Sequence, residues 1–202
     1  MYKTSRLGTR ELAFRSDGNP MTYEELLKLA SEKSDHGDRV VELKPAIEEA
    51  IRNTSPEYPA LEIGNREGGS ALLILAHLGK EGKHRELITA DVNDCAKIVA
   101  ERAGNLSIPY RHFKGTQEDF VKNNAMTFGF VYLDADHVQT NVVRDIGILI
   151  PRLAKGAIVA VDDVEDWGEL PSFEGLERIE YAVDEGNKLG VHGHHAAFYR
   201  KL

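Results

Sequence analysis

Cysteine is almost absent from this sequence. The single residue, Cys95, rules out a disulfide framework, and nothing here indicates an oxidising compartment. Apolar runs are also short, because none approaches the roughly 20 residues that span a bilayer. Residues 1–20 lack the apolar segment of a secretory signal. We therefore expect a cytoplasmic protein that does not enter a membrane.

Positive charge is in deficit too. Lysine and arginine number 25 against 33 acidic residues, which gives a formal net charge of −8. A general nucleic-acid-binding protein would usually carry a basic face, so the composition argues against that class. The hydrophobic share of 42% is ordinary for a globular protein, and 202 residues suffice to bury a core. We expect one domain with an N-terminal extension.

Short apolar runs alternate with amphipathic stretches after Pro59. The runs, read as strands, are 60–64, 86–92, 108–113, 128–134 and 156–163. The stretches between them, read as helices, are 70–79, 94–104, 117–124 and 142–153. Alternating strands and helices are typical of an α/β fold with a doubly wound, mostly parallel sheet. The sequence therefore predicts a Rossmann-like domain over residues 59–202.

Residues 1–58 are expected to form an arm and two helices that act as a lid or make substrate or dimer contacts. Thr22, with Glu25 three residues later, predicts a helix that begins there and ends near Lys33. A second helix is predicted at 40–53.

The C-terminal segment differs from the alternating region. Apolar residues at helical spacing predict a helix over 173–184. Residues 188–192 and 195–201, on either side of Gly193, predict an antiparallel hairpin that closes the edge of the sheet. The prediction is thus a seven-stranded sheet whose last part is antiparallel.

The turn after the first predicted strand has the composition of a ligand-binding loop. Ligands of open α/β sheets bind at the carboxyl ends of the strands. Gly64 and Gly68 permit a close approach of the backbone, and Ser70 stands where it can cap the next helix. Arg66 breaks the dinucleotide GxGxxG spacing, and the GK[ST] of a P-loop is missing. A plain strand-to-helix turn is the alternative interpretation.

Two further strand ends carry candidate binding residues. Asp91 ends the second strand, where a carboxylate can accept hydrogen bonds from both ribose hydroxyls. A solvated loop aspartate is the alternative. After the third strand, Thr116 is explained as a helix cap, and the spacing alone gives only weak support to a contact beside an adenine ring.

Carboxylates gather after the fourth and fifth strands. Asp134, Asp136 and His137 follow one strand, and Asp162 and Asp163 follow the next. Several like charges at close range are unfavourable unless a cation compensates them. Hard oxygen ligands favour Mg²⁺, with Mn²⁺ or Ca²⁺ as alternatives. Helix caps and surface loops would also account for these residues.

These motifs, taken in order, resemble a known family. LEIGNREGGSALLILA resembles the first motif of class I S-adenosylmethionine-dependent methyltransferases, and ITADVNDCAKIVAERAG resembles the second strand and helix of their catechol O-methyltransferase-like branch. FVYLDADH and LIPRLAKGAIVAVDDV resemble later motifs of that metal-dependent branch. The likeness is closer still to small bacterial macrolide-sugar O-methyltransferases, and it covers about residues 59–165.

The resemblance implies a role for each matching residue. The implied cofactor-binding set is Glu62, Gly64, Asn65, Gly68, Ser70, Asp91, Val92, Gly115, Thr116, Gln117 and Asp134. The implied metal ligands are Asp134, Asp162 and Asp163, and His137 occupies the place of a general base. One departure is that residues 65–67 are more polar than is usual in that turn, which bears on the fit of the cofactor.

The function that we expect is transfer of a methyl group from S-adenosylmethionine to a small hydroxylated acceptor, a vicinal diol or a catechol, with a bound Mg²⁺. Histidine, with an ordinary pKa near 6.5, suits proton removal at neutral pH. The resemblance also implies a homodimer. Two alternatives stay open: a nucleotide-sugar glycosyltransferase, because Asp134 and Asp136 form a DxD pattern, and a module that binds the cofactor without turnover.

The remaining notable side chains have plain interpretations. We interpret His192, His194 and His195 as a hairpin turn rather than a second metal site, because one loop seldom supplies a full coordination set. Cys95 is expected on a helix and buried. Trp167 is expected either to wall the acceptor pocket or to pack its own loop.

Overall fold

The computed structural model describes residues 22–33, 37–66, 68–80, 85–93, 99, 108–164, 167–181 and 196–202. A single seven-stranded sheet organises them. Its strands are β1 (Ala60–Ile63), β2 (Leu87–Asp91), β3 (Tyr110–Lys114), β4 (Phe128–Leu133), β5 (Leu153–Asp162), β6 (Leu176–Ile179) and β7 (Ala196–Lys201). Their order across the sheet is β3-β2-β1-β4-β5-β7-β6. The first five strands run parallel, and β7 is antiparallel to both β5 and β6. The predicted Rossmann-like sheet with an antiparallel end is confirmed.

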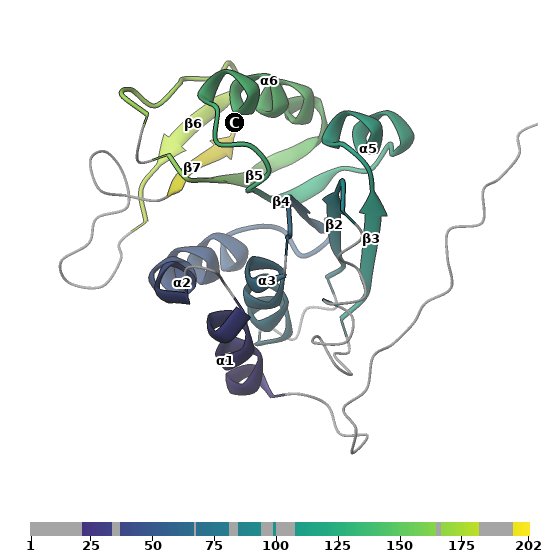
Figure 1. Cartoon of the computed structure of the whole chain (residues 1–202). Helices are drawn as coiled ribbons and strands as arrows, with labels where there is room; N and C mark the ends of the chain where they lie inside the picture. Colours follow the sequence, from purple (N-terminus) through teal and green to yellow (C-terminus); the bar gives the residue numbers. More distant parts are fainter. Residues whose placement is uncertain are drawn as a thin grey trace, which may run out of the picture.

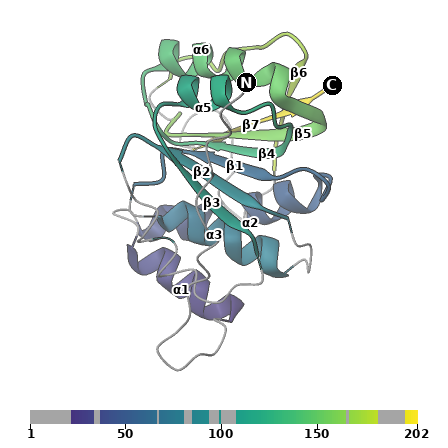
Figure 2. The ribbon, with the colours of Figure 1, turned by 90° about the vertical axis from the view of Figure 1, so that its right-hand side faces the viewer.

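Helices cover both faces of the sheet. The helices α1 (Tyr23–Lys33), α2 (Gly37–Arg52) and α3 (Gly69–Lys80) lie on one face. The helices α5 (Gln117–Asn123) and α6 (Gln139–Leu149) lie on the other, and the short 3₁₀ helix η1 (Ile150–Arg152) leads from α6 into β5. Figures 1 and 2 show this three-layer arrangement from two directions. None of the helices in the described ranges is both long and apolar enough to cross a membrane.

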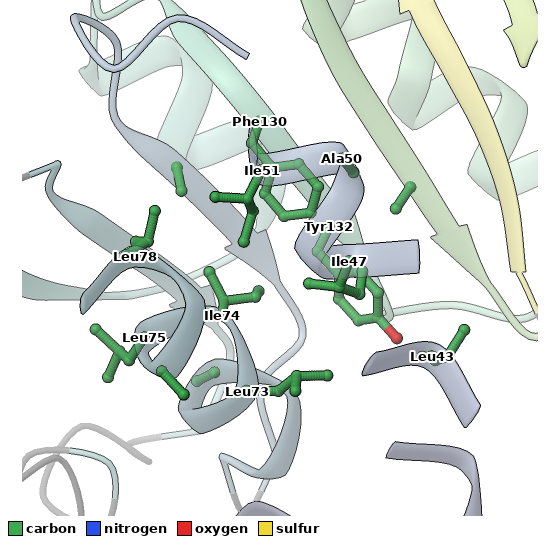
Figure 3. Packing of buried hydrophobic residues seen from close by; sticks show 14 of the residues in the cluster. Leu43, Ile47, Ala50, Ile51, Leu73, Ile74, Leu75, Leu78, Phe130 and Tyr132 are labelled. Atoms are coloured by element: carbon green, nitrogen blue, oxygen red, sulfur yellow. The ribbon is translucent and has the colours of Figure 1, made fainter. Parts of the chain in front are cut away.

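Each face of the sheet has its own hydrophobic core. Successive strand residues point to opposite faces, so Phe130 and Tyr132 pack against α2 and α3, whereas Val131 and Leu133 face the α5–α6 side. Figure 3 shows Ile47 and Ile51 of α2 and Ile74 of α3 around Phe130 and Tyr132. Burial on both faces explains why the parallel strands read as continuous apolar runs.

The start of α1 follows its sequence signal. The Thr22 backbone N–H donates to Glu25 Oε2 at 2.8 Å, and the Glu25 N–H donates to Thr22 Oγ1 at 3.3 Å. This reciprocal pair is the predicted capping box, which satisfies two backbone donors that the helix leaves unpaired. Helix α2 begins at Gly37, three residues before the predicted start.

The helix predicted over 173–184 is wrong. Residues 176–179 form β6, whose Arg178 pairs with Tyr199 of β7. Pairing with a strand distant in sequence overrides the helical spacing of the local apolar residues, and Phe173 packs edge-on against Tyr199 at 5.1 Å. The hairpin is therefore β6–β7. Residues 188–192, Cys95, His192, His194, His195 and, apart from residue 99, the helix predicted at 94–104 lie outside the described residues.

Candidate active site

The turn after β1 lies against the carboxyl end of β4. Gly64 has φ +82°, and a Cβ there would stand 2.4 Å from the backbone oxygen of Asp134. Gly68 has φ +86°, and a Cβ there would stand 2.4 Å from Val99 Cγ2. Both positions need glycine, for the backbone conformation and for the space. The turn leads directly into α3, whose first N–H groups lie at the same edge of the sheet.

Glu62, the third of the four residues of β1, is fully buried, at 0% exposure. Its Oε1 accepts a hydrogen bond from Ser70 Oγ at 2.5 Å, while Oε2 is buried and has no partner in the described part of the chain. Burial raises the pKa of this carboxyl to about 8, the Ser70 hydroxyl lowers it, and the nearby Asp91 charge raises it further. A buried carboxylate with one unsatisfied oxygen is costly, so the site is suited to a cationic ligand group.

Asp91 ties the glycine turn to β2. Its Oδ2 accepts from the backbone N–H groups of Asn65 at 2.9 Å and Arg66 at 3.2 Å, and its Oδ1 accepts from Asn93 N–H at 2.7 Å. The sequence predicted that Asp91 binds a ligand, but it did not predict that Asp91 also holds the glycine turn through these hydrogen bonds. The Asn65 amide is itself buried, and neither its oxygen nor its nitrogen has a partner among the described residues.

The ends of β2 and β3 place the other predicted cofactor residues near one another in the sheet. Val92 follows Asp91 and is 62% exposed, which is unusual for a large apolar side chain. Gly115 N–H donates to the Asp91 backbone oxygen at 2.8 Å. Thr116 Oγ1 caps α5 by accepting from Asp119 N–H at 3.1 Å. Gln117 Nε2 donates to the Asp145 backbone oxygen at 2.6 Å, so that side chain turns toward α6.

Asp134 is the carboxyl group that its surroundings perturb most in this part of the fold. Its pKa is raised far above the ordinary value, first by burial and then by the charges of Asp162, Glu62 and Asp163, while Arg66 lowers it. Three acidic neighbours thus act on one carboxyl at the carboxyl ends of β1, β4 and β5. A bound cation would relieve this repulsion.

The other acidic residues of this edge have distinct partners. Asp162 Oδ2 accepts from Tyr132 Oη at 2.6 Å, and burial first, then the Asp162 charge, holds the pKa of Tyr132 well above its ordinary value. Asp136 precedes α6 and is half-buried, and its carboxylate accepts from Val138 N–H and from Asn141 Nδ2, each at 2.8 Å. These hydrogen bonds hold the Asp136 side chain at the start of α6, whose N-cap residue is Val138.

His137 and Asp163 form the closest charged contact of the site. His137 Nδ1 lies 2.6 Å from Asp163 Oδ2, and the imidazole is 60% exposed. Asp163 adopts φ +53°, a left-handed conformation that is uncommon for residues other than glycine, although aspartate and asparagine adopt it more often than most. The Trp167 indole N–H donates to the His137 backbone oxygen at 3.2 Å. Ligand atoms of Asp134, His137 and Asp163 all lie within 4.8 Å of one another.

Sequence reasoning missed one residue here, Tyr132. Tyr132 precedes Asp134 by two positions in β4, so strand alternation places both on one face, and this spacing was the available signal. Trp167 had been left between two roles, and the structure shows it packed against the α5–α6 core and bonded to His137.

The donor set fits both groups that the sequence pointed to. Carboxylate oxygens with one imidazole suit a divalent cation. The unpartnered polar atoms of Glu62 and Asn65, beside glycines with no room for a Cβ, suit a polar ligand held close to the backbone. Asp134, His137 and Asp163 come together, whereas Asp162 turns to Tyr132.

Comparisons with known proteins agree with this geometry. Residues 61–164 match the family model described as a methyltransferase domain. A search of curated protein sequences finds no significant match.

Solved structures with the same fold include three O-methyltransferase or methyltransferase proteins. An O-methyltransferase from Bacillus cereus, in complex with SAH, is 17% identical, covering 89% of this chain and 90% of that chain with a TM-score of 0.61. TomG from Streptomyces achromogenes, in complex with SAM, is 17% identical, and the match covers 88% of this chain and 89% of TomG with a TM-score of 0.59. MycE of the mycinamycin biosynthetic pathway, in complex with Mg and SAH, is 16% identical, covering 91% and 54%, with a TM-score of 0.56. At these identities the likeness shows a shared fold.

Proposed function

Because the chain belongs to the methyltransferase domain family, we propose that it transfers the methyl group of S-adenosylmethionine to a hydroxyl oxygen of a small acceptor, with a divalent cation in the site. One observation carries the proposal. The segment that matches the family, residues 61–164, contains the glycine turn, Asp91 and the Asp134–His137–Asp163 group, which the fold brings to one edge of the sheet.

The turn after β1 and the ends of β2 and β3 are the proposed cofactor cradle. Glu62 would receive the ammonium group of the methionine part, because its buried carboxyl has an oxygen without a partner in the described structure. Asp91 would accept from ribose hydroxyls in addition to the backbone donors that it already holds. Exposed Val92 would lie against the adenine ring. The cofactor contributes a methyl group activated by its positively charged sulfur.

His137 is the proposed general base. The acceptor oxygen must lie in line with the methyl group and lose its proton as it attacks. The imidazole is exposed and contacts Asp163 through Nδ1. It lies beside the carboxylates of Asp134 and Asp163. Neutral histidine would take the hydroxyl proton.

Asp134, Asp162 and Asp163 are the proposed metal ligands, with Mg²⁺ as the preferred ion. A divalent cation would lower the pKa of an acceptor hydroxyl, most effectively when two adjacent oxygens bind it, as in a vicinal diol or catechol. The raised pKa of Asp134 supports the need for positive charge at this place. The MycE structure, which has the same fold, contains Mg.

The glycosyltransferase alternative loses its main support. A DxD metal motif needs both carboxylates, yet Asp136 is engaged at the start of α6 by Val138 N–H and Asn141 Nδ2. The module without turnover makes a different prediction, namely cofactor binding without a metal site.

Calorimetry tests the proposal. S-adenosylmethionine and S-adenosylhomocysteine are titrated into metal-stripped protein, each with and without Mg²⁺. Micromolar binding, together with a Mg²⁺ site that Asp134→Asn abolishes, is the expected result and justifies a screen of hydroxylated acceptors. Absence of binding by both compounds contradicts the cofactor assignment, and tight binding without a metal site supports the module.

A further inference from the structure

We propose that Asp163 is a positioning residue that fixes the tautomer of His137, holding the proton on Nδ1 so that Nε2 presents its lone pair to the acceptor. The inference rests on the proposed function in one respect, since it names the nitrogen that would receive the acceptor proton. It gives Asp163 a task in addition to the proposed metal binding that it shares with its neighbour Asp162.

The contact itself is the first step. Nδ1 of His137 lies 2.6 Å from Asp163 Oδ2, a distance typical of a charge-assisted hydrogen bond. An ionised carboxylate only accepts hydrogen bonds, so in the neutral imidazole the proton must reside on Nδ1 for this contact to be favourable. The other ring nitrogen, Nε2, is then an acceptor and can serve as a base.

The backbone of Asp163 supports the same conclusion. A φ of +53° is strained for a residue other than glycine, and such strain persists where the surroundings demand it. The left-handed turn separates the two adjacent carboxylates. Asp162 goes to Tyr132 Oη at 2.6 Å, whereas Asp163 goes to His137.

A second contact fixes His137 through its backbone carbonyl group. Trp167 follows Asp163 on the same loop, and its indole N–H donates to the His137 backbone oxygen at 3.2 Å. The indole also packs against the α5–α6 core, which ties the loop to the body of the protein. The loop after β5 therefore fixes His137 through its side chain and through its carbonyl group.

Imidazole ¹⁵N spectra of histidine-labelled, ligand-free protein test the proposal. At about pH 8.5 a neutral imidazole shows which nitrogen carries the proton. The His137 signal is identified by its loss in His137→Gln. The expected result is a proton on Nδ1 in the wild type, and a shift toward Nε2–H in Asp163→Asn, because the amide can donate to Nδ1. Asparagine tolerates the left-handed backbone, and an amide ¹H–¹⁵N spectrum checks that the variant is folded.

The neighbouring carboxylate supplies the matched control. Asp162→Asn removes the same charge one residue away and should leave the His137 tautomer unchanged. If both variants shift the tautomer equally, or if the wild type already carries its proton on Nε2, the positioning role is overturned.

Kinetics extend the test once an acceptor is known. Asp163→Asn should lower kcat by about 10- to 100-fold, less than a fully buried dyad would lose because the imidazole is exposed. If the protein does not bind S-adenosylmethionine, the proposed function is contradicted and the tautomer result is unaffected. If the protein binds it normally but Asp163→Asn leaves the His137 tautomer unchanged, the positioning role is contradicted and the proposed function is not.

Discussion

At the scale of single residues, Glu62 makes ligand-free stability depend on pH. Its folded pKa of about 8 exceeds the ordinary value of 4.5, so its stabilising contribution is complete below pH 4.5 and is lost as pH rises to 8. Glu62→Gln removes this loss and should raise the free energy of unfolding at pH 7 by about 2–3 kcal/mol. The same change should weaken S-adenosylmethionine binding by roughly tenfold or more, because the charge is missing.

Urea unfolding at pH 5, 7 and 8 and calorimetric titration measure the two effects. Glu57→Gln, which alters an exposed glutamate, is the control. Parallel pH dependence in wild type and Glu62→Gln would show that this carboxyl is not the source of the effect.

Gly64 makes a prediction about space. Gly64→Ala would place a methyl group 2.4 Å from the Asp134 backbone oxygen, at φ +82°. We expect a loss of about 2–3 kcal/mol of stability and of cofactor affinity. Gly147→Ala in α6, where a Cβ meets nothing within 4 Å, should leave stability unchanged or raise it by about 0.5–1 kcal/mol. Chemical denaturation compares the two, and equal stabilities would contradict the argument.

At the scale of elements, a buried histidine joins the three helices on one face of the sheet. His77 of α3 is 1% exposed, with Tyr23 Oη 3.5 Å from its Nδ1 and Glu48 Oε2 at 3.8 Å. Burial lowers its pKa to about 4, Glu48 opposes the shift, and Lys80 and Lys44 add to it. The neutral form is therefore the one that the fold accepts.

The sign of the pH effect follows from linkage. Between about pH 6.5 and 4 the unfolded chain binds a proton at His77 that the folded chain does not, so stability falls on acidification by about 2–3 kcal/mol. His77→Gln should flatten this slope in urea unfolding measured from pH 7 to 4.5. His137→Gln, at an exposed histidine, should keep the slope. A slope unchanged by His77→Gln would place the effect elsewhere.

Elements buried on both faces were predictable from sequence, and the paired C-terminal strands were not. The apolar run at 128–134 predicts β4, because parallel strands that helices cover on both faces are apolar throughout. The segment 173–184 carries helical spacing, and only its pairing with β7 makes residues 176–179 a strand. Within the site, the sequence predicted that Asp134, His137 and Asp163 lie at one edge of the sheet, but it could not predict the direction of each side chain. The hydrogen-bond partners of Asp162 and Asp136 depend on the side-chain rotamers and on the local backbone conformation, which the sequence does not reveal.

At the scale of the whole molecule, α1 and α2 share one core with the sheet and α3. Seven buried residues of α1 and α2, none more than 3% exposed, belong to the cluster that includes Phe130 and Tyr132: Leu26, Ala30, Leu43, Ala46, Ile47, Ala50 and Ile51. The larger of these side chains contribute about 1.5–3 kcal/mol each by burial. The role of this region as a lid or dimer contact stays a prediction.

A chain of residues 59–202 should consequently fail to fold. Removing both helices exposes α3, whose Leu72, Ile74 and Leu75 are buried at 1% or less. We expect aggregation, or a circular dichroism spectrum without a cooperative thermal transition. A chain that starts at Thr22 keeps both helices and serves as the control. A soluble, cooperatively unfolding 59–202 would show that the sheet and α3 are sufficient alone.

The position of β7 in the sheet has a consequence for synthesis on the ribosome. Residues 196–201 lie between β5 and β6, so these two strands, which are made earlier, are joined in the sheet only through this later segment. Until β7 is made, the backbone donors and acceptors along this side of β5 lack the partners that β7 provides in the finished sheet. That edge is a template for pairing between nascent chains.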